Sequence, residues 1–381
     1  MISMVFWLSC IPGRRLNRKG KTVSMDDTTI QMLKKLTELS GPPSYERRVR
    51  ACMVDTMTPF VDEVVGDRIG GVFGHKASAE AEAPRVMLAG HMDEVGFIIS
   101  GVSPDGLLQF KPLGGWWSQT LLSQRVTLHT DSDDLTGVIG TRLIRQALSP
   151  SEKASALSID DMVIDCGAVS ASQIHDWGIH VGTFVTPQSA FEVLNGGKRL
   201  LSKAFDNRYG CALALDVLRT LAGEALPCDL YSGATVQEEG GLRGASAAAE
   251  LLKPDLFIAV DSSAARDVSR KPEELGRLGD GFLLRAFDSR MRPDYAFREW
   301  TQKLAEDHGI PYQWFYSHGT TDAAAVQSTG IGVPSIVIGI ASRYNHSHSV
   351  IVDRDDYDAS LRIVCEIIRS MSRETYAGLL P

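Results

Sequence analysis

The spacing of hydrophobic positions predicts alternating helices and strands over most of this chain. Apolar residues three or four positions apart predict amphipathic helices over 26–39, from about 44 to 57, and again near the C-terminus. Short apolar runs predict strands at 86–89, 96–101, 229–237, 256–260 and 335–340. Because strands and helices alternate from about residue 200 onward, we expect an α/β fold with a mostly parallel sheet covered by helices.

The region from about 102 to 195 has a different pattern. Its short β-branched runs are separated by turn residues, which predicts a small β-rich domain inserted into the α/β domain. Within it, Ser149 to Glu152 has the form of a capping box with proline at the first helical position, so one helix is expected there. The predicted divisions are a disordered extension over 1–24, a first catalytic part over 25–101, the insertion over 102–195 and a second catalytic part over 196–381.

Two adjacent carboxylates, Glu238 and Glu239, follow the predicted strand 229–237 and precede a glycine turn. Adjacent acidic residues most often belong to a solvated loop. These two follow an apolar strand, however, and ligands of open α/β sheets collect beyond the carboxyl ends of the strands. Two ionised carboxylates removed from water repel each other unless a cation or a shared proton lies between them. The pair therefore indicates a metal site or acid/base chemistry.

Further polar residues occupy the ends of other predicted elements. They are His91 and Asp93 after one strand, Asp261 after a second, His346 after a third, and Asp206 at the start of a helix. A single His or Asp in such a position is more often a hydrogen-bonded cap than a ligand. Several on one rim of one sheet indicate a metal site. Imidazoles and carboxylates without a nearby cysteine suit zinc, cobalt or manganese, and two ions that share a carboxylate would lie roughly 3.5–4 Å apart.

Composition narrows the class of protein. The chain has 381 residues, of which 44% are hydrophobic and 23% charged, as is typical of a globular protein with a large core. Its net charge of -8 argues against a nucleic-acid surface. No apolar run reaches the roughly 18–20 residues of a membrane helix. Six scattered cysteines without CxxC spacing indicate buried thiols, so we expect a cytoplasmic protein.

Five short motifs resemble those of the glutamyl aminopeptidase/TET aminopeptidase family, which includes the FrvX-type proteins. In chain order they are Gly90-His91-Met92-Asp93, Lys203-Ala204-Phe205-Asp206-Asn207-Arg208, Gln237-Glu238-Glu239, Thr321-Asp322-Ala323 and Arg343-Tyr344-Asn345-His346-Ser347. The resemblance covers about 25–377. It implies a dinuclear metal-dependent aminopeptidase that removes N-terminal residues from peptides. It also implies a phosphorylase/hydrolase-like mixed sheet, a PDZ-like insertion that mediates dimers, and a tetrahedral homo-dodecamer.

The resemblance further implies a role for each candidate residue. The implied metal ligands are His91 and Asp261 for one ion, Glu239 and His346 for the other, and Asp206 for both. Asp93 would orient His91, because a metal-bound imidazole usually needs a partner for its other nitrogen. Glu238 would be the general base that takes a proton from the attacking water and passes it to the leaving amine. His348 is expected behind the ligands or at the surface.

Other enzyme classes stay open at this point. A metal-dependent deacylase or carboxypeptidase would use the same pair of ions. Some relatives of the family have been labelled endoglucanases, but a glycosidase needs two carboxyl groups and no metal, which leaves both rim histidines without a role. A non-enzymatic metal-binding role would require the loss of a ligand or of Glu238, and none is lost. The preferred N-terminal residue and the native metal are left undetermined.

Overall fold

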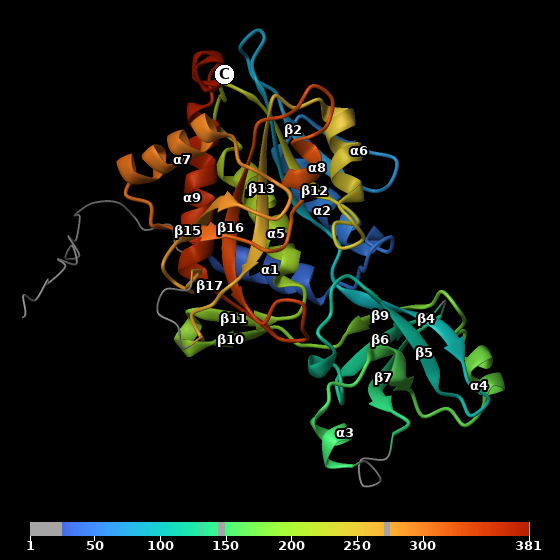
Figure 1. Ribbon diagram of the computed structural model, residues 1–381. Helices are drawn as coiled ribbons and strands as arrows, with labels where there is room; N and C mark the ends of the chain where they lie inside the picture. The colour runs from blue at the N-terminus through green and yellow to red at the C-terminus, as the bar shows by residue number, and fades with distance from the viewer. Residues whose placement is uncertain (1–24, 131, 144–148, 270–274, 381) are drawn as a thin grey trace, which may run out of the picture.

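The computed structural model describes residues 25–130, 132–143, 149–269 and 275–380, and the extension predicted over 1–24 lies outside them. The described residues form a large α/β domain and a small β barrel, which lies below it in Figure 1. No helix of these residues is long and apolar enough to cross a membrane. All five cysteines in the described part of the chain are free thiols, and four of them are buried.

The large sheet is mixed. Its central strands are parallel, in the order β12 (Asp229–Thr235), β3 (Arg85–His91), β13 (Leu256–Ala264) and β16 (Ser335–Arg343). Antiparallel strands flank them, with β2 (Val72–Lys76) and β1 (Glu63–Gly66) on one side and β17 (Val350–Asp353), β11 (Arg199–Ser202) and β10 (Glu192–Leu194) on the other. In addition, β14 (Phe282–Phe287) pairs with β16 and with β15 (Tyr312–Tyr316). The sequence pattern predicted a mostly parallel sheet, whereas the flanking strands are antiparallel. These flanking strands are only three to five residues long, so they leave a weak signal in the pattern of apolar residues.

Helices cover both faces of this sheet (Figure 1). One hydrophobic cluster joins the sheet to α1 (Asp27–Glu38), α2 (Arg47–Met57), α5 (Phe205–Thr220), α7 (Tyr295–Asp307) and α9 (Arg354–Ser370). A second cluster joins the opposite face to α6 (Arg243–Leu252) and α8 (Ala323–Val326). The chain ends with α10 (Arg373–Leu379). The predicted first helix is confirmed, since Leu33 and Leu36 are fully buried and Asp26 caps it by accepting from the Thr29 amide at 2.8 Å.

The second sheet closes into a barrel with its own hydrophobic core. Its strands, in order around the barrel, are β4 (Gly96–Val102), β5 (Leu108–Leu113), β8 (Met162–Asp165), β7 (Asp134–Thr141), β6 (Arg125–His129) and β9 (Phe184–Pro187). The same segment contains α3 (Pro150–Ala154), at the expected helix, and α4 (Ala171–Asp176). The barrel begins at Gly96 and ends at Pro187, whereas the sequence pattern gave 102 and 195. The difference arises because β4 pairs with β5 and β9, and β10 pairs with β11 of the large sheet.

Helix α5 packs directly on the end of β3. A Cβ atom added at Gly90 would lie only 2.6 Å from the carbonyl carbon of Gly210 in α5, closer than real Cβ atoms come. Because Gly90 has no side chain, α5 can lie directly against the carboxyl end of the strand. This close approach brings Asp206 next to His91.

A buried ion-pair network holds the two segments that flank this contact. Lys203 donates to the two carboxylate oxygens of Glu94 at 2.7 and 2.6 Å. Arg208, which is fully buried, donates to the Met92 carbonyl at 2.6 Å and lies 3.4 Å from Glu94. Lys203 and Arg208 flank Asp206 in the sequence. Their bonds to Glu94 and Met92 therefore hold the start of α5 against the loop after β3. Removal of one partner would leave an unpaired buried charge.

Candidate metal centre

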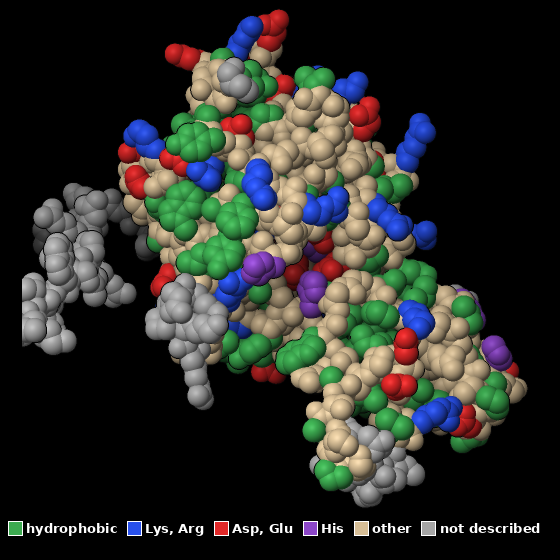
Figure 2. All heavy atoms as spheres, viewed as in Figure 1, with side chains coloured by type: hydrophobic (Ala, Val, Ile, Leu, Met, Phe, Trp, Pro, Cys, Tyr) green, Lys and Arg blue, Asp and Glu red, His purple; other side chains and the backbone are tan. Residues whose placement is uncertain are grey.

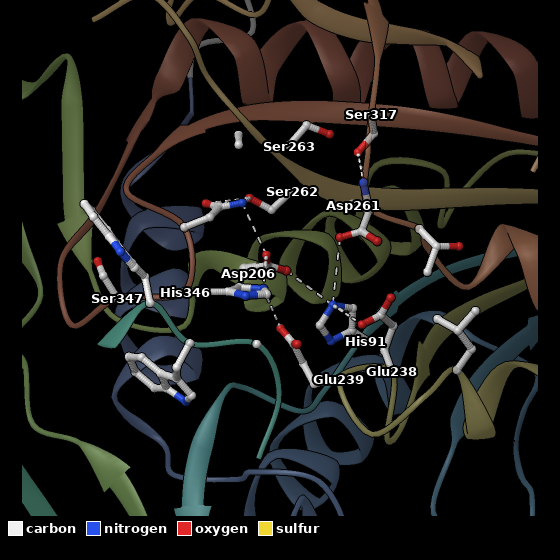
Figure 3. A pocket seen from close by; sticks show the side chains of 18 of the residues that line it. His91, Asp206, Glu238, Glu239, Asp261, Ser262, Ser263, Ser317, His346 and Ser347 are labelled. Carbon is white, nitrogen blue, oxygen red and sulfur yellow. Dashed lines mark hydrogen bonds and ion pairs between the residues drawn. The ribbon is translucent and has the colours of Figure 1, made fainter. Parts of the chain in front are cut away.

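The carboxyl ends of the central strands bring the predicted site residues together. His91 ends β3, Asp206 opens α5, Glu238 and Glu239 follow β12, and His346 follows β16. Asp261 lies within β13, which continues to Ala264 instead of ending at 260 as predicted. Figure 3 shows these six side chains pointing toward one another. They line a cavity of about 860 Å³, and Figure 2 shows acidic and histidine side chains in the hollow where the large domain meets the barrel.

His91 is the centre of one cluster. Its Nε2 lies 3.3 Å from Oδ1 of Asp206 and 3.8 Å from Oδ1 of Asp261. Oε2 of Glu238 is slightly farther from the same nitrogen, at 3.9 Å. The His91 side chain is only 2% exposed, so the sheet and α5 hold these groups away from bulk water.

His346 is the centre of a second cluster. Its Nε2 lies 3.0 Å from Oε1 of Glu239 and 3.5 Å from Oδ2 of Asp206. Asn345 donates to that same Asp206 oxygen at 3.3 Å. Asp206 therefore directs one carboxylate oxygen toward each imidazole, and it stands between the two clusters.

The ionisation of these groups reflects their crowding. Burial raises the pKa of Asp261 to about 8 and that of Glu238 well above its usual range. Burial acts to lower the pKa of His346, but Asp206 and Glu239 outweigh it and raise that pKa to about 11. A divalent cation would displace the retained protons, because metal ligands bind in their deprotonated forms. Imidazole nitrogens and carboxylate oxygens are donors that zinc, cobalt and manganese accept, so these residues fit a metal centre.

Asp93 connects His91 to the acidic pair. Nδ1 of His91 lies 3.1 Å from the Asp93 backbone carbonyl and 3.4 Å from its Oδ1. The carboxylate oxygens of Asp93 accept the backbone amides of Glu238 and Glu239 at 3.0 and 2.8 Å. Asp93 is fully buried, and one side chain thus contacts the imidazole and also fixes the backbone of both acidic residues.

Glu46 accepts from the backbone amide of Gln237, the residue before the acidic pair, and the sequence did not predict this contact. Its Oε1 accepts from the backbone N–H of Gln237 at 3.1 Å and from that of Ser44 at 3.0 Å. Gln237 has a φ of 57°, in the left-handed region, which turns the chain so that the two carboxylates diverge. Glu238 then lies near His91 and Glu239 near His346. The only sequence signal was an acidic residue just before a helix, which is typical of a local cap.

Three more polar residues near the site have roles that sequence reasoning left open. His348 is buried, and its Nε2 lies 3.1 Å from the Arg125 carbonyl of the barrel, so it is behind the ligands. Asp322 accepts from the Thr235 hydroxyl, and burial raises its pKa to about 6. Arg285 is buried at the cavity and donates to Ser263 Oγ at 2.6 Å. No strand was predicted around Arg285, which left it unassigned.

Comparison with known proteins identifies the family. Residues 70–363 match the family model described as M42 glutamyl aminopeptidase. This chain belongs to that family. M42 members are metal-dependent aminopeptidases, hydrolases that act on peptide bonds, so the activity implied by the motifs is confirmed at this level.

Individual relatives agree with the family match over nearly the whole chain. A glutamyl aminopeptidase of Lactococcus lactis is 37% identical over 352 residues, which are 91% of this chain and 98% of the relative. A TET aminopeptidase from the archaeon Thaumarchaeota archaeon SCGC AB-539-E09 has a TM-score of 0.90 at 37% identity and covers 93% of this chain and 99% of its own. The TET1 peptidase of Pyrococcus horikoshii can assemble into a tetrahedron or a large octahedral shell. It has a TM-score of 0.81 at 28% identity, and the match covers 90% of this chain and 99% of that peptidase.

The pKa of Glu46 generates a prediction about stability. Burial, and then the charge of Asp93, raise this pKa from 4.5 to about 7. Between those two values the folded protein retains a proton that the unfolded chain releases, so the stability contributed by Glu46 is present at low pH and lost as pH rises toward 7. We expect the Tm of the unaltered protein, relative to that of Glu46→Gln, to fall between pH 5 and pH 7.5.

Scanning calorimetry of metal-free protein at both pH values measures this difference. Glu250→Gln, at an exposed position on α6, is the matched control, and its Tm should follow that of the unaltered protein at both pH values. An identical pH dependence in Glu46→Gln and the unaltered protein would contradict the assignment.

Proposed function

We propose that this M42 family member removes N-terminal residues from peptides with two divalent metal ions held by the rim residues. The proposed ligands are His91 and Asp261 for one ion, Glu239 and His346 for the other, and Asp206 for both. The observation that carries the proposal is the position of Asp206, whose two carboxylate oxygens lie 3.3 and 3.5 Å from the two imidazoles. Zinc or cobalt is the proposed metal, and manganese also fits these donors.

Glu238 is the proposed general base. Divalent ions bound at this rim would acidify a water molecule and polarise the scissile carbonyl. Glu238 takes the proton from the attacking water and delivers it to the leaving amine. The divergence of the two carboxylates supports this division of roles, because Glu239 is 3.0 Å from His346 whereas Glu238 is farther from its imidazole, at 3.9 Å from His91. Asp93 holds the backbone of both and orients His91.

The geometry and the family favour peptide hydrolysis over the other enzyme classes considered. A glycosidase with two carboxyl groups has no use for the imidazoles of His91 and His346, which contact the carboxylates most closely. A deacylase or carboxypeptidase would use the same ligands, and only the substrate distinguishes it from an aminopeptidase. Family membership favours a substrate with a free N-terminal amine.

Activity is predicted to depend on bound metal. Chelation should abolish hydrolysis of aminoacyl chromogenic amides, and refilling with Zn²⁺, Co²⁺ or Mn²⁺ should restore it, because the ligand set carries carboxylates that need a cation. Rates and metal content are measured on the same samples. An N-acetylated amide is the matched control and should stay uncleaved by every form. Full activity in protein shown to be free of metal would overturn the two-ion proposal.

Substitution of Glu238 and of Glu239 is predicted to have different effects on metal content and turnover. Glu238→Gln should keep both ions and lose about 10²–10⁴-fold in turnover, since it removes a general base but preserves shape. Glu239→Gln should lower the occupancy of the ion next to His346. Elemental analysis and kcat are measured together for both variants.

Two results would contradict the roles proposed for Glu238 and Glu239. If Glu238→Gln loses metal while Glu239→Gln retains both ions, the two roles are reversed. If Glu238→Gln turns over at the unaltered rate, Glu238 is not the base and the mechanism is wrong.

We further propose that the chain assembles into a homo-dodecamer built from dimers, with the barrel in the dimer contact. A related TET structure that is a dodecamer and the tetrahedral assembly of the Pyrococcus horikoshii TET1 peptidase support this proposal. Light scattering of the intact protein should give a mass near that of twelve chains of 41.5 kDa. A mass of one chain at assay concentration would contradict it.

A cytoplasmic location is also part of the proposal. Free thiols that stay buried, such as Cys211 and Cys228, are typical of proteins in a reducing compartment. The acidic net charge of -8 favours a freely diffusing protein over one that binds nucleic acid.

A further inference from the structure

The barrel contributes one wall of the metal-site cavity. The segment that follows β5, residues 114–120, is called the strap here, and its residues Gly115, Trp116, Trp117 and Thr120 line the cavity together with His91, Glu239 and His346. The strap belongs to the inserted domain, for which the family resemblance implies a part in dimer contacts. In Figure 2 the barrel lies directly against the hollow that contains the acidic and histidine side chains.

The strap backbone lies against two of the proposed ligands. Gly114 has a φ of 82°, and a Cβ added there would be 2.6 Å from Val95 Cγ1 and 2.9 Å from Glu239 Oε2. A Cβ added at Gly115 would be 3.2 Å from His346 Nδ1. The two glycines therefore let the strap approach the centre more closely than other residues would allow. The tight fit fixes the position of the next two residues relative to the metal centre.

Trp116 anchors the strap. Its ring stacks on Phe97 at a centroid distance of 4.7 Å, and its Nε1 donates to the Gly96 carbonyl at 3.1 Å. On the other side its ring is 5.8 Å from that of His348, which belongs to the large domain and reaches the Arg125 carbonyl of the barrel at 3.1 Å. The anchor thus holds the barrel and the large domain together beside the cavity.

Trp117 has the opposite environment. Trp117 is 64% exposed although it lines the cavity. Its backbone is fixed by two hydrogen bonds, because its carbonyl accepts from the Thr120 amide at 3.0 Å and from the Thr120 hydroxyl at 2.8 Å. A large aromatic side chain left open to solvent on a fixed backbone forgoes the stabilisation that burial would give. Aromatic rings presented this way bind ligands well, because they supply apolar area with few rotatable bonds.

We propose that Trp117 is a substrate-binding residue that contacts the peptide, so that the barrel completes the binding site. The indole face would pack against an apolar side chain or a peptide plane of the substrate held at the metal centre. This inference rests on the proposed peptidase function. It assigns to the inserted domain a part in substrate binding in addition to assembly.

The test compares Trp117→Ala and Trp117→Phe with Tyr295→Ala. Tyr295 is the matched control, because it is an aromatic residue 69% exposed on α7 and outside the residues that line the cavity. We expect Trp117→Ala to raise KM for aminoacyl amides and short peptides about 3- to 10-fold with kcat within about twofold, since an aromatic contact made equally in ground and transition states affects binding alone. Trp117→Phe should be intermediate, and Tyr295→Ala should match the unaltered protein.

Two further measurements separate the possible outcomes. A non-hydrolysable dipeptide analogue, titrated calorimetrically into metal-loaded protein, should bind Trp117→Ala more weakly by the same factor. Metal content and light-scattering mass should be unchanged. An unaltered KM and an unaltered analogue affinity overturn the inference, as does a change in KM that accompanies metal loss or a smaller assembly. If the unaltered, metal-loaded protein hydrolyses no peptide, the proposed function fails, and binding of the analogue still decides the role of Trp117.

Discussion

The centre depends on three consecutive backbone amides being held by two buried carboxylates. Glu46 accepts the amide of Gln237, and Asp93 accepts those of Glu238 and Glu239. These bonds stabilise the left-handed conformation of Gln237, so that two neighbouring acidic side chains lie in different clusters. Without that constraint the two carboxylates could turn toward the same imidazole, and the two proposed roles could not be separated. The amides of Ser44 and Gln237 act to lower the pKa of Glu46, but burial and the charge of Asp93 outweigh them.

The large domain supplies the rigid frame around that constraint. Parallel strands align their carboxyl ends, so His91 of β3 lies in register with Thr235 of β12, just before the acidic pair. Helix α5 adds Asp206, and the helix packs against the end of β3 because Gly90 leaves room for it. The ion pair between Lys203 and Glu94 then fixes the start of this helix against the loop after β3. Each proposed ligand therefore comes from a different element, and the packing of those elements sets the distances.

The barrel completes the cavity from outside the sheet. Its strap packs on Glu239 and His346 through Gly114 and Gly115, while His348, two residues after a proposed ligand, contacts the barrel. Further contacts across the same boundary join Tyr45 Oη to the Gly182 carbonyl at 3.0 Å. The proposed ligands Glu239 and His346 and the cavity wall formed by the strap therefore meet at one boundary between the two domains. The insertion therefore lines the cavity as well as having its own hydrophobic core.

The sequence by itself predicted the side chains that the structure brings together at the cavity, because each stands at the end of an apolar run or the start of a helix and so carries a local signal. The order of the motifs likewise indicated the family. Tertiary structure decided what depends on contacts between distant segments. Glu46 accepts from Gln237, which is 191 positions away in the chain. Strand β4 was predicted in the catalytic domain, but it belongs to the barrel because it pairs with β5 and β9. Periodicity reports which side of an element is buried, whereas the identity of its neighbours follows from how the elements pack. For that reason the exposed Trp117 gave no signal in the sequence, and only the folded chain places it at the cavity.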